Sequence, residues 1–337
     1  MSLSPSMKAK VAAALEEFKA FKTALHARCP HVSYETADPD ADLGGQCPPK
    51  PEAIRWVREL KPANDKLDLV LAEAVAELTA GLPAPPPISR DKLWLWGGPT
   101  PYWCGSTDED TLVTGADYFN AKNVVYVYGP VNEKMLAKLK KYDKVLCQVT
   151  SNCRSPGAQV ESDAECAEKT SRLALQFPNL IGGLMDDSMQ HSQKYSYATP
   201  GDRFRDVNAA LKKHKKDMIL AGVIYVNEFD QYDFSGVMPH FDVVNLWFWS
   251  KHELLELDDK IAQCRKLFPG KKILLGCFIH DYGLTDLGNA PVLLNYQLSR
   301  AAQHLQDGVI DGVVILGDRE IRKWPASTAA VKDFLNR

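Results

Sequence analysis

The sequence lacks the features that mark membrane, nucleic-acid-binding and zinc-binding proteins. No apolar run approaches the roughly 18 residues needed to span a bilayer. Its 40 lysines and arginines face 43 aspartates and glutamates, a net charge of −3, so there is no basic excess to attract nucleic acid. None of the eight cysteines forms a CxxC pair, the usual mark of structural zinc. We therefore expect no membrane association, no nucleic-acid partner and no cofactor.

The N-terminus also lacks a signal peptide, because residues 7–28 form a charged amphipathic pattern rather than an apolar segment. Residues 1–6 resemble a leader before a start at Met7, which leaves export through a removed signal sequence as an alternative. Cys147 and Cys277 lie in apolar runs and are expected to be buried, whereas a disulfide between Cys29 and Cys47 is an alternative for that loop. We expect a reducing, cytoplasmic environment.

What the chain does have is the length and pattern of an α/β protein. Residues 1–90 predict a helical extension, with helices over residues 8–28, 51–60 and 64–80 and a Pro-rich break at 82–87. From residue 91 to 337, apolar runs alternate with amphipathic stretches. We predict strands at Leu93–Gly97, Asn123–Tyr128, Lys144–Val149, Leu180–Asp186, Met218–Val226, Asp242–Trp249, Lys272–His280 and Gly312–Gly317. We predict helices at residues 108–120, 131–141, 159–177, 202–216, 251–268, 290–307 and 326–336.

Eight near-continuous apolar strands alternating with helices indicate a parallel sheet covered on both faces. Eight such units over about 245 residues match a (β/α)8 TIM barrel. The competing fold is a doubly wound open sheet, whose dinucleotide-binding form needs a GxGxxG turn after the first strand. Here that strand leads into Gly97-Gly98-Pro99, which lacks the spacing. We therefore predict a TIM barrel over residues 91–337, carrying an N-terminal helical extension.

Barrels place their active sites at the carboxyl ends of the strands. Aromatic and polar residues dominate these predicted ends, and aromatic faces and amide or charged groups suit sugar rings. The candidate substrate-binding residues are Trp96, Trp103, Tyr128, Gln148, Asn152, Tyr225, Trp247, Trp249, His280 and Arg319.

Carboxylates on different strand ends suit glycoside hydrolysis, in which one protonates the leaving oxygen and another attacks or activates water. Asp186 and Asp187 end the fourth strand, where a charge beside apolar surroundings is costly unless it is used. Because neighbouring strand residues face opposite sides, we expect one of the pair in the site. Asp186 is nearer to the strand and is favoured, with Asp187 pairing with a loop cation, but the reverse order is an alternative. The candidate catalytic residues are therefore Asp186, Asp187, Glu228 and Asp281, with Glu228 or Asp281 as the catalytic partner of the pair.

Structural roles are the alternative for each of these residues. Asp186 or Asp187 could cap a turn, Glu228 could lie on the surface, and Asp281 could hydrogen-bond the backbone of its own turn. His280 could be a core histidine. Asp318 and Arg319 could form a local ion pair of little energetic weight.

The segment from Phe177 to Asp187, FPNLIGGLMDD, resembles the fourth strand of glycoside-hydrolase-like TIM barrels, including poorly characterised ones. The resemblance covers residues 91–337 in architecture and one strand in motif. Chitinase-like relatives carry DxxDxDxE on that strand, and other families carry a catalytic Glu on strands four and seven. This chain has neither pattern. The resemblance implies a sugar-active fold and a small-molecule or oligosaccharide substrate, without naming the sugar.

Two other functions remain as alternatives. A metal-dependent barrel hydrolase or isomerase could use His191, His280, Asp186, Glu228 and Asp281 as ligands, although the first strand lacks the HxH motif common in such barrels. A carbohydrate-binding barrel without catalysis would keep the aromatic residues but lack the acid–base pair. The sequence does not indicate an oligomeric state.

Overall fold

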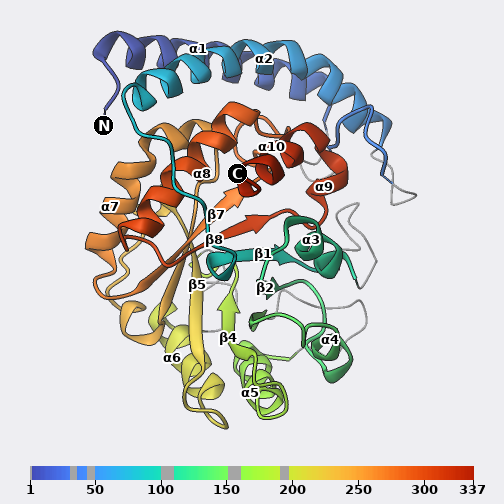
Figure 1. Cartoon of the computed structure of the whole chain (residues 1–337), viewed down its shortest axis with the longest axis vertical. Helices are drawn as coiled ribbons and strands as arrows, with labels where there is room; N and C mark the ends of the chain where they lie inside the picture. The colour runs from blue at the N-terminus through green and yellow to red at the C-terminus, as the bar shows by residue number, and fades with distance from the viewer. Residues whose placement is uncertain (1, 31–35, 44–49, 100–109, 151–160, 190–196) are drawn as a thin grey trace.

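The computed structural model describes residues 2–30, 36–43, 50–99, 110–150, 161–189 and 197–337. Eight parallel strands form a closed barrel in the order β1 to β8 (Figure 1). The strands are β1 Leu93–Gly97, β2 Asn123–Tyr126, β3 Lys144–Gln148, β4 Leu180–Met185, β5 Ile219–Tyr225, β6 Val243–Trp247, β7 Lys272–Phe278 and β8 Gly312–Leu316. Trp96 of β1 pairs with Val125 on one side and with Leu316 on the other, which closes the sheet. The predicted TIM barrel is confirmed.

Helices surround the barrel near the predicted positions. They are α3 Thr111–Phe119, α4 Glu133–Lys138, α5 Asp163–Leu173, α6 Pro200–Leu211, α7 Leu257–Leu267, α8 Pro291–Gln306, α9 Glu320–Lys323 and α10 Pro325–Leu335. The helix predicted over 251–268 divides into a 3-10 helix, η6 Lys251–Glu256, followed by α7. The short α9 was not predicted. After β5 the chain forms only the short 3-10 helices η4 Val226–Glu228 and η5 Met238–His240, where the sequence left no room for a full helix.

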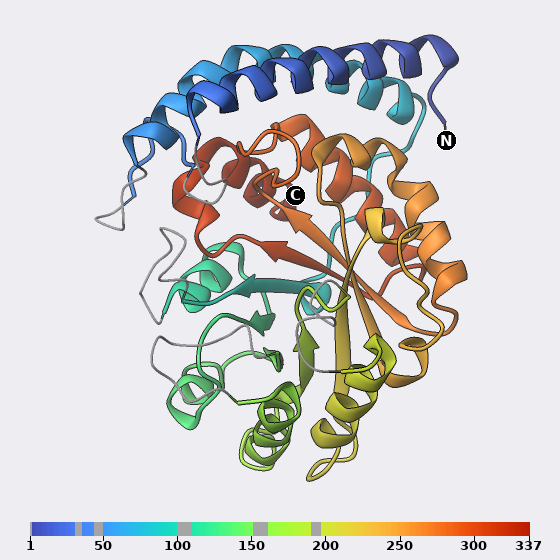
Figure 2. The ribbon, with the colours of Figure 1, turned by 180° about the vertical axis from the view of Figure 1, so that it is seen from behind.

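Two long helices, α1 Pro5–Arg28 and α2 Pro51–Thr79, precede the barrel. They lie together along the side where α8 and α10 are found (Figures 1 and 2). The prediction of separate helices at 51–60 and 64–80 is wrong, because α2 runs through Pro62 without a break. An interior proline costs a helix about 3 kcal/mol. Burial of Trp56, Leu60 and Leu67 on either side of Pro62 offsets that cost.

The interior of the barrel is filled by aromatic side chains. Trp96 and Trp247 make an edge-to-face contact with ring centroids 5.6 Å apart, and Trp247 lies 4.4 Å from Phe278. Gly276 makes this packing possible, since a Cβ atom there would lie 2.1 Å from Cδ2 of Trp247. The interior is therefore closed by packed rings, and any ligand must bind above them at the mouth.

Two expectations about the chain's environment can be compared with the structure. Cys147 and Cys277 are buried free thiols, and burial raises the pKa of Cys277 to about 12. Cys29 is also a free thiol, which donates to the carbonyl oxygen of Glu52, while Cys47 lies outside the described residues. Among the described helices, none is long and apolar enough to cross a membrane.

Candidate active site

A cavity of about 100 Å³ lies at the mouth of the barrel, where the strands end. Residues from seven strand ends line it: Trp96, Tyr128, Asp186, Asp187, Val223, Tyr225, Trp247, Trp249, Phe278, Tyr282, Leu316 and Arg319. Eight of these are residues that the sequence predicted for the site. Its volume is below the roughly 300–1,000 Å³ of whole ligand sites, so these walls enclose only part of a sugar-sized molecule.

Asp186 and Asp187 both line this cavity, which corrects the expectation that only one of them would. Strand β4 ends at Met185, so the alternation of faces stops before the pair. Asp187 has a φ of +43°, in the left-handed region that non-glycine residues rarely adopt. This turn of the backbone brings two neighbouring carboxyl groups to one cavity. Strained backbone of this kind is common at functional sites.

The environment of Asp186 favours its protonated form. The residue is 8% exposed, and burial raises its pKa well above the ordinary value, with the neighbouring Asp187 as the second cause. The backbone N–H of Asp187 donates to Oδ1 of Asp186 at 3.1 Å and opposes this effect only in part. Asp186 is therefore poised to hold a proton at the cavity and to donate it.

Asp187 is supported by a tyrosine from the next strand. The hydroxyl of Tyr225, at the end of β5, donates to Oδ1 of Asp187 at 2.9 Å. Burial, followed by the charges of Asp187 and Asp186, raises the pKa of Tyr225 well above its ordinary value. The tyrosine thus stays protonated and remains the donor of this hydrogen bond to Asp187.

Tyr128 is held at the mouth in a strained conformation. Its φ is +66°, which explains why β2 ends two residues earlier than predicted. The side-chain oxygen of Gln148 accepts from the backbone N–H of Tyr128 at 3.1 Å, and the Gln148 amide donates to Thr150. Gln148 therefore positions Tyr128, and it is not among the described residues that line the cavity.

The aromatic walls differ in how far a ligand can reach them. Trp96 and Trp247 are 2% and 1% exposed, and the Trp247 indole donates to Asn245. Trp249 is 37% exposed and stacks on Tyr282 with ring centroids 5.5 Å apart and planes 27° from parallel. Of these three tryptophans, Trp249 is the one that presents a face for stacking with a ligand.

The end of β8 contributes a buried charged group. Arg319 lines the cavity, donates to the hydroxyl of Tyr282 at 3.5 Å and lies 3.8 Å from the Glu320 carboxylate. Asp318 accepts from the backbone N–H of Gly98 at 2.9 Å, and burial raises its pKa to about 6. A side chain at Gly97 would overlap Asp318, since a Cβ there would lie 2.3 Å from its carboxyl carbon. Arg319 is therefore part of a network with Tyr282 and Glu320 at the wall.

Besides Gln148, three predicted site residues that the structure describes lie away from the cavity lining. Oε2 of Glu228 accepts from the backbone N–H of Tyr225 at 2.9 Å. Asp281 is 1% exposed and accepts four hydrogen bonds, from the backbone N–H groups of Lys251, Leu284 and Thr285 and from the Thr285 hydroxyl. His280 is buried against the rings of Tyr282 and Trp324, and burial lowers its pKa.

The remaining predicted residues cannot be placed, and some lining residues were not predicted. Trp103 and Asn152, and His191 of the metal alternative, lie outside the described residues. Tyr282 follows the predicted seventh strand and was not assigned to the site, although an aromatic residue just past a strand end was a usable signal. Val223, Phe278 and Leu316 carried no such signal, because apolar residues inside strands are expected everywhere in a barrel. Within the described part of the chain, no group of three His, Cys, Asp or Glu residues is arranged to hold a metal ion.

Comparisons with known proteins give structural neighbours and no sequence relatives. No family model and no curated protein matches the chain. A candidate alpha-L-fucosidase from Bacteroides thetaiotaomicron is similar, with a TM-score of 0.52 and 10% identity, over 76% of this chain and 96% of that one. A domain of a thermostable chitinase from Pyrococcus furiosus has a TM-score of 0.48 and 11% identity, and the match covers 75% of this chain and 97% of that one. A beta-glucuronidase from Bacteroides uniformis has a TM-score of 0.46 and 13% identity, and the match covers 67% of this chain and 30% of that one. The similarity to the alpha-L-fucosidase agrees with the barrel fold of this chain and shows the fold alone.

Proposed function

We propose that the protein is a glycoside hydrolase in which Asp186 is the general acid and Asp187 is the second carboxyl group of the site. The observation that carries the proposal is the pair itself: two carboxyl groups line one aromatic cavity, and burial beside Asp187 favours the protonated form of Asp186. Glycoside hydrolysis uses an acid with a raised pKa together with a second carboxyl group. The fold alone would not carry it, because TIM barrels serve many chemistries.

In the proposed reaction, the Asp186 proton passes to the glycosidic oxygen as the bond from that oxygen to the anomeric carbon breaks. Asp187 stabilises the positive charge that develops on the sugar ring. Water then adds to the anomeric carbon, and the proton it releases returns to Asp186. Every proton is accounted for, and no other reactant is needed.

The aromatic residues suit the binding of the sugar. The exposed face of Trp249, braced by Tyr282, can stack on the C–H face of a ring that projects from the cavity. Arg319 also lines the cavity, beside Tyr282, and its guanidinium group can donate a hydrogen bond to a substituent of the sugar ring. Glu228 and Asp281, which the sequence offered as partners of Asp186, have no part in this proposal because backbone donors occupy them.

A screen of aryl glycosides and oligosaccharides tests the proposal. We expect the protein to hydrolyse at least one of them, and Asp186→Asn to lower turnover of an oligosaccharide by about 10²–10⁴-fold, the usual contribution of general acid catalysis. A chelator should leave the rate unchanged, because neither carboxyl group acts through a metal. Equal turnover by the variant, or no hydrolysis of any compound, would overturn the proposal. Binding without hydrolysis would favour a carbohydrate-binding barrel.

A further inference from the structure

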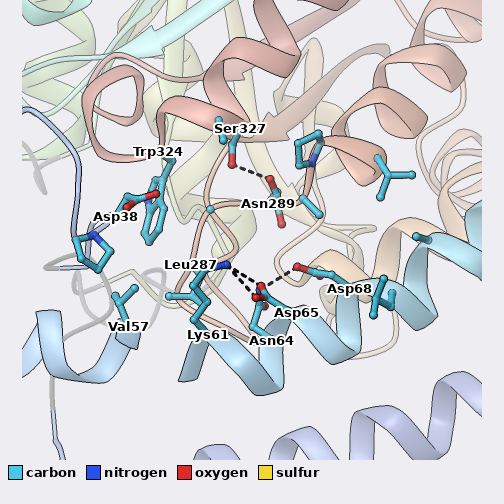
Figure 3. Close-up of a pocket in the computed structure, with 18 residues that line it drawn as sticks. Asp38, Val57, Lys61, Asn64, Asp65, Asp68, Leu287, Asn289, Trp324 and Ser327 are labelled. Atoms are coloured by element: carbon cyan, nitrogen blue, oxygen red, sulfur yellow. Dashed lines mark hydrogen bonds and ion pairs between the residues drawn. The ribbon is translucent and has the colours of Figure 1, made fainter. Parts of the chain in front are cut away.

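A second cavity, of about 470 Å³, lies between α2 and the barrel. Its walls come from α2, from the segment Leu287 to Val292 that leads into α8, and from the start of α10 (Figure 3). Its volume falls within the roughly 300–1,000 Å³ typical of small-molecule sites. It is also larger than the cavity at the barrel mouth, so it has the room for a whole small ligand that the mouth lacks.

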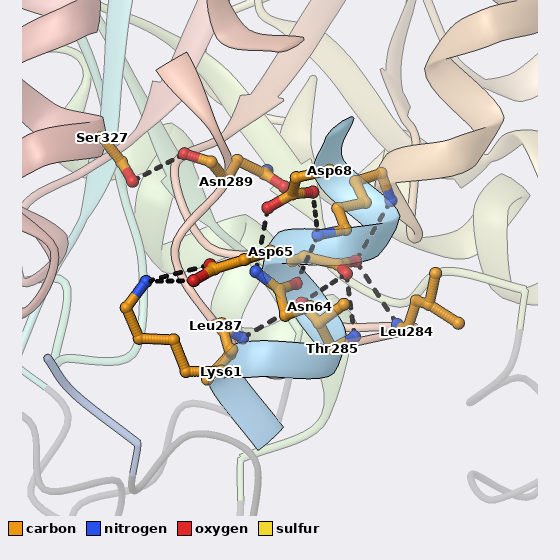
Figure 4. A network of polar contacts seen from close by, with 11 residues as sticks. Lys61, Asn64, Asp65, Asp68, Leu284, Thr285, Leu287, Asn289 and Ser327 are labelled. Carbon is orange, nitrogen blue, oxygen red and sulfur yellow. Dashed lines mark hydrogen bonds and ion pairs between the residues drawn. The ribbon is translucent and has the colours of Figure 1, made fainter. Parts of the chain in front are cut away.

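A buried ion pair fixes α2 as one wall of this cavity. The ammonium group of Lys251, which is fully buried, donates to Oδ1 of Asn64 at 2.6 Å and pairs with Asp68. Asn64 in turn donates to Asp68 at 2.9 Å, on the same helix (Figure 4). Lys251 begins η6 in the barrel, so these contacts join residues more than 180 positions apart. This polar network holds α2 against the barrel, because moving α2 away would leave the buried ammonium group of Lys251 without its partners.

Two buried polar atoms on the barrel side of the cavity have no hydrogen-bond partner among the residues that the structure describes. They are Oδ1 of Asn289 and Nε1 of Trp324, in residues that are 4% and 7% exposed and line the cavity. Figure 3 shows both residues facing α2. The Asn289 amide nitrogen donates to the Phe278 carbonyl, which leaves its oxygen as an acceptor, while the Trp324 indole offers a donor. An unmade hydrogen bond at a buried atom costs about 1–3 kcal/mol, so both atoms favour a polar ligand.

The starts of two helices add donors on the same side. Both α8 and α10 begin with a proline and have no side-chain cap, and both line the cavity. On the α2 side, the carboxylates of Asp65 and Asp68 supply acceptors, and Lys61 donates to Asp65 at 2.9 Å. These carboxylates disfavour an anion at the helix starts. Donors on one wall and acceptors on the other instead suit hydroxyl groups, which both donate and accept.

We propose that this cavity binds a neutral, hydroxyl-rich ligand, a monosaccharide or a disaccharide. Its hydroxyl groups donate to Asn289 and accept from Trp324, while its C–H surface lies against apolar residues such as Val57 and Leu69. Both unpaired atoms are closed to water, so binding includes a small side-chain adjustment at this wall. The site is separate from Asp186 and needs no hydrolysis.

Nuclear magnetic resonance tests the proposal directly, with the Trp324 indole N–H as the reporter. Methyl glycosides of glucose, galactose, mannose, fucose and N-acetylglucosamine are added to the full-length Asp186→Asn protein, so that any hydrolysis at the barrel mouth is strongly slowed. We expect at least one glycoside to shift the Trp324 signal, which Trp324→Phe identifies by its loss. No shift with any glycoside would overturn the proposal.

A matched pair of variants on α2 locates the binding. Ala72 lines the cavity and is half-buried, so Ala72→Phe fills it and should weaken binding by about tenfold or more. Ala76, exposed one turn further along α2, is not among the lining residues, so Ala76→Phe should bind as the parent does. Unchanged binding by Ala72→Phe would contradict the proposal. Because the readout is binding, a failure here and a failure of hydrolysis at Asp186 are distinguishable.

Discussion

The carboxyl ends of β4 and β7 look alike in sequence and differ in structure. Each is a buried apolar strand followed by an aspartate, Asp186 after β4 and Asp281 three residues after β7. Asp281 accepts four hydrogen bonds from a tight turn. Within the described part of the chain, Asp186 accepts one, from its neighbour's N–H, and it lies beside a second carboxyl group. A buried carboxylate surrounded by donors organises a turn, whereas one with a single donor that faces a cavity is available for chemistry.

The two strand ends also contribute differently to the mouth. The end of β4 supplies carboxyl groups, and the end of β7 supplies the aromatic side chains Phe278 and Tyr282. The acid chemistry therefore gathers at one side of the cavity and the stacking surface at the other. The comparison predicts that substitutions at β4 change turnover and that substitutions at Asp281 change stability.

The largest effect on stability should come from Asp281→Ala. It leaves buried donors of Lys251, Leu284 and Thr285 unpaired, and we expect the free energy of unfolding to fall by about 3–5 kcal/mol. Asp186→Asn should not lower it at pH 7, because a neutral amide replaces a carboxyl group for which the charged form is disfavoured. Denaturant unfolding of the two variants measures the difference. Equal losses would end the distinction between the two aspartates.

The pH dependence of stability extends the comparison to β8. The pKa of Asp318 is raised to about 6 in the folded protein, from 3.8, so the folded state holds a proton that the unfolded state has lost. The free energy of unfolding should fall as the pH rises from about 4 to 6, by on the order of 2–3 kcal/mol from this group. In Asp318→Asn this part of the decrease should disappear. Parallel pH profiles for the two proteins would contradict the assignment.

Trp249→Ala should weaken substrate binding while leaving the acid in place. We expect KM to rise by about tenfold, the order of one lost stacking residue, with a small change in kcat. Trp247 is the matched control, because its ring is buried against Trp96 and Phe278. Trp247→Ala should show its main effect in denaturant unfolding. Michaelis kinetics with an unchanged KM in Trp249→Ala would remove Trp249 from the binding surface.

The smallest effects come from a pair of variants that each remove one hydroxyl donor. Tyr225→Phe removes the donor to Asp187, and Thr285→Val removes one of the four donors to Asp281. Each lost hydrogen bond costs about 1 kcal/mol. Tyr225→Phe should lower kcat severalfold with little change in stability, and Thr285→Val should lower the free energy of unfolding with kcat unchanged. The reverse pattern would contradict the comparison.

Sequence patterns predicted the architecture well because periodicity carries it. The eight strands lie within a few residues of their predicted bounds, and Asp186 was recognised from the cost of a charge beside an apolar strand. The left-handed conformation of Asp187 was not predictable, since it depends on how the chain leaves β4. The four donors to Asp281 belong to a turn and to a residue 30 positions away. Such contacts are set by tertiary structure, which strand and helix periodicity do not encode.

The central claim is that Asp186 donates the proton to the leaving group. It is tested most directly by comparing wild type and Asp186→Asn on two glycosides of the same sugar, one with a 2,4-dinitrophenyl leaving group and one with an alkyl leaving group. A dinitrophenolate departs without protonation, so the account predicts a loss of about 10²–10⁴-fold for the alkyl glycoside and a far smaller loss for the dinitrophenyl glycoside. Equal losses for both substrates would contradict the role of Asp186 as the acid.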